Sequence, residues 1–205
     1  MTNPGNATPV RRARRYDPDR KGRILDAAIE VLAEHGVAGT THRLIATAAG
    51  VPLGSLTYHF TSLEDLRAQA FFRLSQRVST AYEAHFQGVR TTLELVEAVT
   101  DLVHDAVGAD AVEWAATYEL YVAALRDPAL REVTETWMRT SRTVLERFVD
   151  PETARGLDAL IEGLIMHRML STAPASRVQT RAAISRALTS LPAPAPAVMA
   201  SESRS

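Results

Sequence analysis

A segment of twenty residues, Thr41 to Phe60, carries the side chains best suited to bind a nucleic acid. It is rich in short polar groups, and its second half adds a phenol and an imidazole. Such groups form hydrogen bonds to phosphate oxygens and base edges, and methyl groups contact thymine. The residues expected to contact DNA are Thr41, His42, Arg43, Pro52, Leu53, Gly54, Ser55, Thr57, Tyr58 and His59.

Two short helices around a tight turn would position these side chains. Thr40 or Thr41 can cap the first helix, because a threonine oxygen accepts from an unpaired backbone N–H. Gly50 supplies the positive φ that ends this helix, and Pro52 suits the first position of the next one. The pattern predicts a helix-turn-helix whose second helix lies in the major groove. The alternative is a helical corner inside some other helical protein.

The flanking residues favour the helix-turn-helix. Leu56 and Phe60 lie four residues apart and anchor the second short helix to a core. Apolar residues at helical spacing over Ile24–Gly36 predict a preceding helix that begins near Asp17-Pro18 and ends at Gly36. Ser62–Asp65 is a capping box that opens a long following helix. A three-helix unit followed by a capped long helix is therefore expected.

Four motifs in this region resemble the TetR (tetracycline-repressor) family. They are IxxAAxxxxxxxG (Ile24 to Gly36), TTxxxIAxxAGV (Thr40 to Val51), GSLxYHF (Gly54 to Phe60) and SxEDL (Ser62 to Leu66). The resemblance covers about residues 20–72. It implies an all-α, nine-helix fold, with an N-terminal helix-turn-helix domain of three helices and a C-terminal helical domain for ligand binding and dimerisation.

Three positions depart from the family pattern. Leu44 stands where an acidic or polar residue is usual, and Thr57 where a large or aromatic residue is common. Leu63 replaces a common lysine and so removes a side chain suited to neutralising a phosphate. Together with the near-neutral charge, this departure favours a rival interpretation, a helical ligand-binding or enzyme module with a vestigial helix-turn-helix.

Composition bounds the class of protein. The chain has 205 residues, 46% of them hydrophobic, and no cysteine, so a globular fold is expected and disulfides, thiolate nucleophiles and cysteine-based zinc sites are excluded. No run reaches the 18 apolar residues of a membrane span. The N-terminal segment lacks the apolar stretch of a secretory signal. We expect a cytoplasmic protein with no membrane partner.

Charge is distributed unevenly although the net charge is only −1. Residues 1–62 carry eight Lys/Arg against five Asp/Glu, and Arg11, Arg12, Arg14 and Arg15 stand ahead of the first helix. We expect residues 1–16 to form a disordered basic arm whose Arg12, Arg14 and Arg15 reach a phosphate or the minor groove. The alternative is a solvated tail without a partner.

The remainder divides into two domains and a tail. Residues 17–61 are expected to form the DNA-binding domain, 62–191 the effector-binding and dimerisation domain, and 192–205 a disordered tail rich in proline, alanine and serine. Glycine, proline and aspartate breakpoints predict helices in the second domain at Ser62–Gln87, Thr92–Val107, Asp110–Arg126, Ala129–Val149, Pro151–Leu170 and Ser176–Ser190.

The Pro151–Leu170 helix is apolar on two faces, whereas a surface helix needs only one. The second face indicates burial against another subunit. With the last helix it would complete a four-helix dimer interface, as the family resemblance implies, although a helix central to its own domain is the alternative. The interface residues expected are Ala159, Gly163, Met166, Leu170, Ala182 and Leu188.

Aromatic residues cluster in the second domain. They suit a mostly apolar pocket with a few polar groups, and the family resemblance implies a small-molecule effector there, of a kind that the sequence does not name. The alternative is that aromatic residues at helical spacing simply form core. The expected lining is Phe86, His104, Trp114, Tyr118, Tyr121, Trp137 and Met138.

Enzyme interpretations find little support. The six histidines are scattered, and HExxH, GxSxG, P-loop and GxGxxG motifs do not occur. No catalytic residues, metal site or cofactor are expected. The function predicted by resemblance is a ligand-responsive transcriptional regulator, a repressor that binds a palindromic double-stranded DNA operator as a homodimer and is released by its effector.

Overall fold

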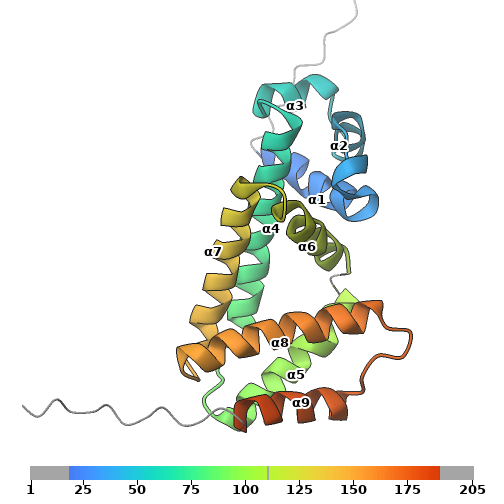
Figure 1. Ribbon diagram of the computed structural model, residues 1–205. Helices are drawn as coiled ribbons and strands as arrows, with labels where there is room; N and C mark the ends of the chain where they lie inside the picture. The colour runs from blue at the N-terminus through green and yellow to red at the C-terminus, as the bar shows by residue number, and fades with distance from the viewer. Residues whose placement is uncertain (1–18, 110, 190–205) are drawn as a thin grey trace, which may run out of the picture.

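The computed structural model describes residues 19–109 and 111–189. The predicted arm, the Asp17-Pro18 helix start and the predicted tail at 192–205 lie outside these ranges. The described part is all α-helix (Figure 1). Its helices are α1 (Arg20–Gly39), α2 (His42–Ala48), α3 (Leu53–His59), α4 (Leu63–His85), α5 (Thr92–Ala109), α6 (Ala111–Ala124), α7 (Pro128–Leu145), α8 (Pro151–Leu170) and α9 (Arg177–Thr189).

The helix-turn-helix forms as its local signals require. The side-chain oxygen of Thr41, not that of Thr40, caps α2 by accepting from the Leu44 backbone N–H at 3.3 Å. Thr40 instead donates its hydroxyl to the carbonyl of Gly36 at 2.7 Å. Gly50 takes a φ of 62° in the turn. A side chain at this φ would be strained, so the turn requires glycine.

Several helix boundaries differ from those expected. Gly36 has a φ of 67° and breaks α1, but one further turn continues to Gly39. Pro52 is the residue before α3 and not its first helical residue. In the second domain, α8 has the expected bounds, whereas α7 begins at Pro128 and ends at Leu145, four residues earlier than expected.

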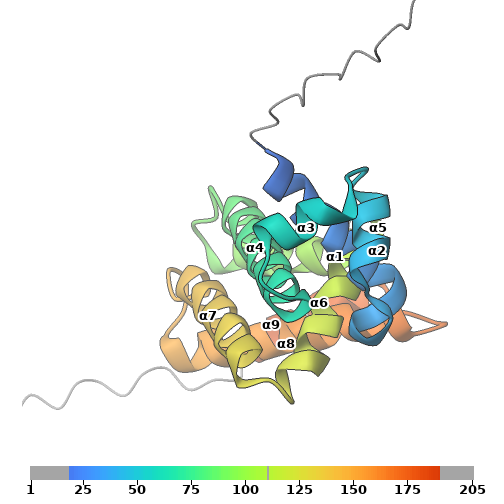
Figure 2. The same cartoon turned by 90° about the horizontal axis from the view of Figure 1, so that it is seen from above.

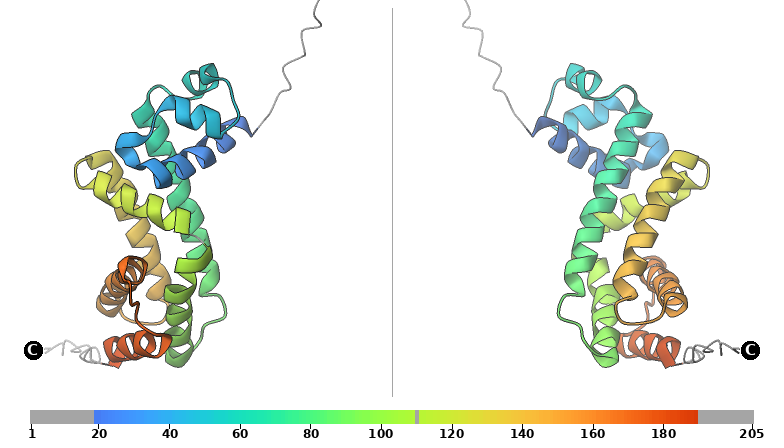
Figure 3. Two further views of the ribbon diagram at one scale, coloured as in Figure 1. Left: turned by 90° about the vertical axis from the view of Figure 1, so that its right-hand side faces the viewer. Right: turned by 90° about the vertical axis from the view of Figure 1, so that its left-hand side faces the viewer.

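The helices form an elongated molecule with two ends (Figures 1 and 3). One end holds α1, α2 and α3, and the other holds α5, α8 and α9. The long helix α4 joins the ends, and α7 runs beside it (Figure 2). Between the ends, α6 packs against α1, α4, α5 and α7. Features at the two ends are therefore connected by one continuous helix.

Each end has its own hydrophobic core. The first core joins α1–α3 to α4, α6 and α7, and includes Leu56, Phe71 and Trp137. The second joins the last turn of α4 and the loop after it to α5, α7, α8 and α9, and includes Phe86 and Ile165. No helix in the described ranges is long and apolar enough to cross a membrane.

Candidate DNA-binding surface and candidate ligand cavity

The helix α3 divides its residues sharply between core and solvent. Leu56 is fully buried and Phe60, just past the helix, is 4% exposed, so both anchor α3 as expected. Tyr58 is 83% exposed and Leu53 50% exposed. Exposed large side chains that lie together on one face mark a contact surface more often than single ones do. The outer face of α3 therefore presents a surface without a partner in the described chain.

The other residues expected to contact DNA lie on the same end of the molecule. Five of them are exposed and three are partly buried. The exposed ones are Thr41, Arg43, Pro52, Gly54 and Thr57, and the partly buried ones are His42, Ser55 and His59. The hydroxyl of Thr57 donates to the Gly54 carbonyl at 3.2 Å. Arg12, Arg14 and Arg15 lie outside the described residues. Their contact with DNA remains a prediction.

The N-terminus of α4 adjoins this surface. The Ser62 hydroxyl accepts from the Asp65 backbone N–H at 3.0 Å, and Asp65 accepts from the Thr61 backbone N–H at 2.8 Å. Leu63 packs partly buried against the first core. The departure at position 63 thus replaces a cation by an apolar contact that supports the start of α4.

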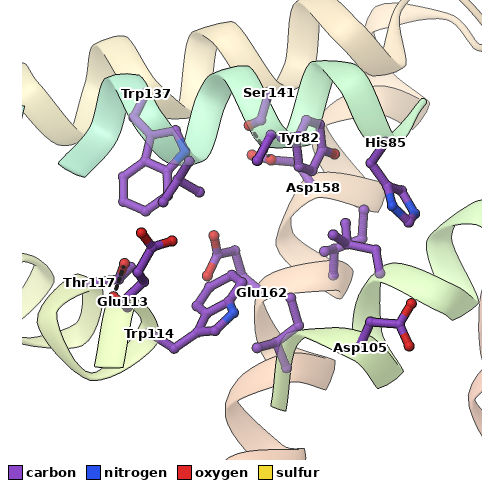
Figure 4. A pocket seen from close by; sticks show the side chains of 15 residues that line it. Tyr82, His85, Asp105, Glu113, Trp114, Thr117, Trp137, Ser141, Asp158 and Glu162 are labelled. Atoms are coloured by element: carbon purple, nitrogen blue, oxygen red, sulfur yellow. Dashed lines mark hydrogen bonds between the residues drawn. The ribbon is translucent and has the colours of Figure 1, made fainter. Parts of the chain in front are cut away.

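A cavity of about 200 Å³ lies between α4, α5, α6, α7 and α8 (Figure 4). Trp114 of α6 and Trp137 of α7, both among the residues expected at an effector pocket, line this cavity, and they are the chain's two tryptophans. Leu102, Ile161 and Ile165 add apolar wall. The space is on the scale of a small aromatic molecule, and its mixed aromatic and polar lining is typical of ligand sites.

Five other residues expected at the cavity have different surroundings. Phe86 is 1% exposed and belongs to the second core. His104 shares a 3.1 Å hydrogen bond with the Thr180 hydroxyl. Tyr118 and Tyr121 lie behind the lining, as neighbours of Trp114 and Trp137. Met138, partly buried, is also not among the lining residues.

The sequence analysis missed the polar groups that α4, α7 and α8 contribute. These lining residues are Tyr82, His85, Ser141, Asp158 and Glu162. The two carboxylates carried a usable signal, because each lies three residues before an apolar residue of the buried α8 stripe, Ile161 or Ile165, and so shares its face. Asp and Glu are rarely placed among buried residues unless they are paired or functional.

The two α8 carboxylates differ in their partners. Asp158 accepts from the Ser141 hydroxyl at 2.6 Å and from Arg142 Nε at 3.1 Å. Glu162 Oε1 accepts from the Tyr121 hydroxyl at 3.0 Å, and Glu162 Oε2 is buried without a hydrogen-bond partner in the described part of the chain. Burial, and secondarily Asp158, raises the pKa of Glu162 to about 7, although the Tyr121 hydrogen bond opposes this shift.

An ion-pair chain connects the cavity to the DNA-binding end. Glu113 lines the cavity and pairs with Arg77 of α4. Arg77 also lies 3.5 Å from Asp26 of α1, which Arg73 holds with two hydrogen bonds of 2.7 and 2.9 Å. The Arg73 hydrogen bond lowers the pKa of Asp26 despite partial burial. A carboxylate of the cavity wall is thus two ion pairs away from α1.

A second connection runs from α6 to the end of α1. Glu119 Oε2 accepts from the Val37 backbone N–H at 2.9 Å. Arg67 of α4 donates to the carbonyl oxygens of Val37 and Thr40 at 2.7 and 2.9 Å. These contacts satisfy backbone groups that the break at Gly36 leaves unpaired. The last turn of α1 is held by α4 and α6 together.

The two apolar faces of α8 have different environments. Leu157, Ile161 and Ile165 are buried in the second core. On the other face Ala159 is exposed, Met166 is 37% exposed and Leu170 is 78% exposed. Gly163 is partly buried, and no atom of another described element lies within 4 Å of the position that a Cβ would take. On α9, Ala182 and Leu188 are partly buried.

A helix-turn-helix with an exposed second helix, joined by one long helix to an all-helical domain, is the architecture of a helix-turn-helix transcriptional regulator. Two family models match the chain. Residues 24–70 match the bacterial regulatory proteins of the tetR family, and residues 90–190 match the tetracyclin repressor-like C-terminal domain. The chain belongs to the TetR family of transcriptional regulators.

Two solved structures resemble most of the fold, and a curated relative matches part of the sequence. SCO7518 of Streptomyces coelicolor A3(2), described as a transcriptional regulator, is 47% identical, with a TM-score of 0.78 over 84% of this chain and 99% of that one. The multidrug binding protein EbrR complexed with ethidium is 36% identical, with a TM-score of 0.72 over 84% and 99%. The HTH-type transcriptional regulator CymR of Pseudomonas putida is 28% identical over 62% of each chain. The chain therefore spans less than two thirds of the length of CymR.

Proposed function

We propose that this regulator is a repressor that binds a palindromic operator as a homodimer in the bacterial cytoplasm and leaves it when a small molecule occupies the cavity. The observation that carries the proposal is the exposed outer face of α3, with Tyr58 83% in solvent. This face lies at one end of α4, and the cavity lies at the other.

The uncovered face of α8 supports the dimer. Met166 and Leu170 expose apolar surface beside the open space at Gly163. A second copy of the chain would cover this face, and a two-fold axis there would present two α3 helices to two operator half-sites. A single half-site gives little affinity, so dimerisation is part of the DNA-binding mechanism.

The cavity and the relatives support an effector. EbrR is named a multidrug binding protein, and its structures contain ethidium, proflavin, malachite green or imidazole. In the present chain the cavity is lined from five helices, so a ligand there contacts α4, α6 and α8 at once. A ligand that binds one arrangement of these helices more tightly than another shifts the population toward the arrangement it binds.

The connections between cavity and α1 support a route for this shift. Val78 and Tyr82 of α4 line the cavity, while Arg73 of the same helix holds Asp26 of α1. A change in the tilt of α4 therefore moves α1, and with it the helices packed on α1. The proposed effector acts by changing the separation of the two α3 helices, which must match half-sites about one turn of DNA apart.

A gel-shift experiment tests the proposal. Duplexes that bind the full chain are selected from a random library, and we expect a palindromic sequence bound with an affinity that falls as salt rises, because phosphate contacts release counterions. A compound screen by quenching of tryptophan fluorescence then finds cavity ligands, which are added to the complex. Failure to select any duplex would support the rival function, a helical ligand-binding module.

A further inference from the structure

We propose that the cavity selects aromatic molecules that carry one positive charge, and that the Glu162 carboxylate holds this charge between Trp114 and Trp137. The inference rests on the proposed function, because it names the chemical class of the effector for the same cavity. It follows from the charges that line the cavity, from their partners and from the arrangement of the indole rings.

The lining is acidic. Among the described residues it contains four carboxylates, those of Asp105, Glu113, Asp158 and Glu162, and no lysine or arginine. Its one histidine, His85, has its Nε2 atom 2.7 Å from the Ala98 carbonyl oxygen. A carbonyl only accepts hydrogen bonds, so this ring nitrogen carries a proton and is not free to bind a ligand cation. The electrostatic character of the space therefore favours cations over anions.

Three of the four carboxylates already have an environment that stabilises their charge. Glu113 pairs with Arg77, Asp158 pairs with Arg142, and Asp105 is exposed to water. Glu162 has none of these. Among the described residues its carboxylate receives a hydrogen bond from Tyr121, and no basic side chain lies within ion-pair distance. A buried carboxylate without a cation is costly to ionise, and a ligand cation would remove that cost.

The aromatic groups lie where such a cation would need them. Figure 4 shows the Glu162 carboxylate pointing into the space between the indoles of Trp114 and Trp137. Flat indole faces stack on an aromatic ring system and attract a positive charge through the π-electrons. Tyr82 adds a third ring to the wall, and its buried hydroxyl has no hydrogen-bond partner within residues 19–109 and 111–189.

Binding of a permanent cation should release a proton. In the empty cavity the Glu162 carboxyl holds a proton below pH of about 7, and a cation stabilises the ionised form. The proton leaves to water as the ion pair forms, so charge is conserved. The other titratable or charged groups around Glu162 are Tyr82 and His85 on α4, Asp105 on α5, Glu113, Tyr118 and Tyr121 on α6, Arg142 on α7 and Asp158 on α8.

Isothermal titration calorimetry with a matched pair of probes tests the inference. The probes are 10-methylacridinium, a permanent cation, and acridine, which has the same ring system and is neutral at pH 8. We expect the full chain to bind the cation at least about tenfold more tightly, as a charge-assisted contact implies. Quenching of the two cavity tryptophans shows that the probe occupies the cavity.

Substitution of Glu162 isolates its contribution. Glu162→Gln keeps an acceptor for the Tyr121 hydroxyl but has no charge, so it should weaken cation binding about tenfold and leave acridine binding within about twofold. Glu162→Asp keeps the charge and should retain the cation preference in part. The control is Glu135→Gln, which removes a charge from an exposed position on α7 and should change neither affinity.

The pH dependence gives an independent readout. Affinity for 10-methylacridinium should rise roughly tenfold from pH 6 to pH 8 in the unmodified chain and stay constant in Glu162→Gln. Equal binding of the two probes, cation binding that is unaffected in Glu162→Gln, a pH dependence that persists in that variant, or no binding of either probe would each overturn the inference. A gel shift without probe, measured in parallel, tests the proposed function separately.

Discussion

Tyr58 is the most exposed of the large hydrophobic side chains described at the DNA-binding end, at 83%. Its ring contacts His59 edge-on, with centroids 5.0 Å apart, and it makes no contribution to the core. We expect Tyr58→Ala to weaken operator binding by about 1–3 kcal/mol without affecting the fold. The measurements are a quantitative gel shift and circular dichroism.

Tyr58→Phe provides the matched control, because it removes the hydroxyl and keeps the ring. A loss with phenylalanine equal to the loss with alanine would assign the contact to the hydroxyl, and full retention would assign it to the ring. Unchanged affinity in Tyr58→Ala, with a normal spectrum, would contradict the assignment of the outer α3 face to DNA.

Glu162 gives a prediction about stability that requires no ligand. The folded state raises the pKa of this carboxyl to about 7 from the ordinary 4.5, so between these values the folded protein binds more protons than the unfolded chain. Stability therefore falls as pH rises through this interval. The corresponding free energy is about 3 kcal/mol at pH 8, because each pKa unit is worth about 1.4 kcal/mol.

Comparison of thermal unfolding in the unmodified chain and Glu162→Gln checks this pH dependence. As the pH rises from 4.5 to 8, the free energy of unfolding of the variant should increase by about 3 kcal/mol relative to that of the unmodified chain. A constant difference across this range would show that Glu162 is already ionised in the folded protein below pH 7.

The sequence predicted part of the cavity at the level of single residues. Helical spacing placed Trp114, Tyr118 and Tyr121 on one face of α6, but only Trp114 reaches the cavity lining. Tyr121 turns toward Glu162 and stacks near Trp137. Spacing along one helix determines which residues share a face, whereas the neighbouring helices that cover the face depend on the tertiary packing.

At the scale of elements, α6 joins the cavity to the last turn of α1 through Glu119. We expect Glu119→Ala to retain ligand binding in the cavity and to raise the ligand concentration needed to release DNA by about fivefold or more, since allosteric coupling is typically worth 1–3 kcal/mol. Calorimetry measures the first quantity, and a gel shift with added ligand measures the second.

Glu135→Ala on the exposed side of α7 is the control for Glu119→Ala. If Glu119→Ala released DNA at the same ligand concentration as the unmodified chain, the connection through Val37 would be structural only. A parallel loss of ligand affinity would place the effect in the cavity and not in its connection to α1.

Helix boundaries were predictable where the sequence contains a strong local signal. The α8 bounds follow from Asp150 and Pro151 at the start, where the Asp150 carboxylate caps the helix. The end of α7 was predicted too late, because Phe148 and Val149 continue as a turn in which the Phe148 N–H donates to Leu145 at 2.9 Å. Apolar spacing does not distinguish such a turn from a further turn of helix.

The extra turn of α1 beyond Gly36 has a different origin. Its backbone groups receive partners from α4 and α6, namely Arg67 and Glu119, which are about 30 and 82 residues away in the chain. A local rule identifies the glycine that interrupts a helix. It contains no information on distant side chains that stabilise the residues beyond the interruption.

At the scale of the whole molecule, Gly163 tests the dimer. Apart from its chain neighbours and the backbone of α8, no atom of residues 19–109 and 111–189 lies within 4 Å of a Cβ built there, so an arginine at this position has room in the single chain. We expect Gly163→Arg to fold normally, to be monomeric by light scattering and to lose operator binding, because a close approach of two helices leaves no space for a long charged side chain.

Ala129→Arg at the exposed start of α7 adds the same charge away from α8 and should remain dimeric. A dimeric Gly163→Arg variant would move the subunit contact to another surface. A variant that no longer folds, as judged by thermal unfolding, would instead indicate that the α8 face is covered within one chain.

The length of α4 determines how far its DNA-binding end moves when the helix tilts about its cavity end. Its 23 residues extend over roughly 34 Å, so a tilt of about 5° about the cavity end displaces the other end by roughly 3 Å, close to the 3.4 Å rise of one base pair. In a two-fold dimer the displacements add, and the half-site spacing changes by nearly two base pairs. Operators with one or two base pairs inserted between half-sites therefore test the liganded state. An insertion that restores binding in the presence of the effector would show that the α3 helices move apart and, because each base pair also rotates a half-site by about 35°, that they turn relative to each other.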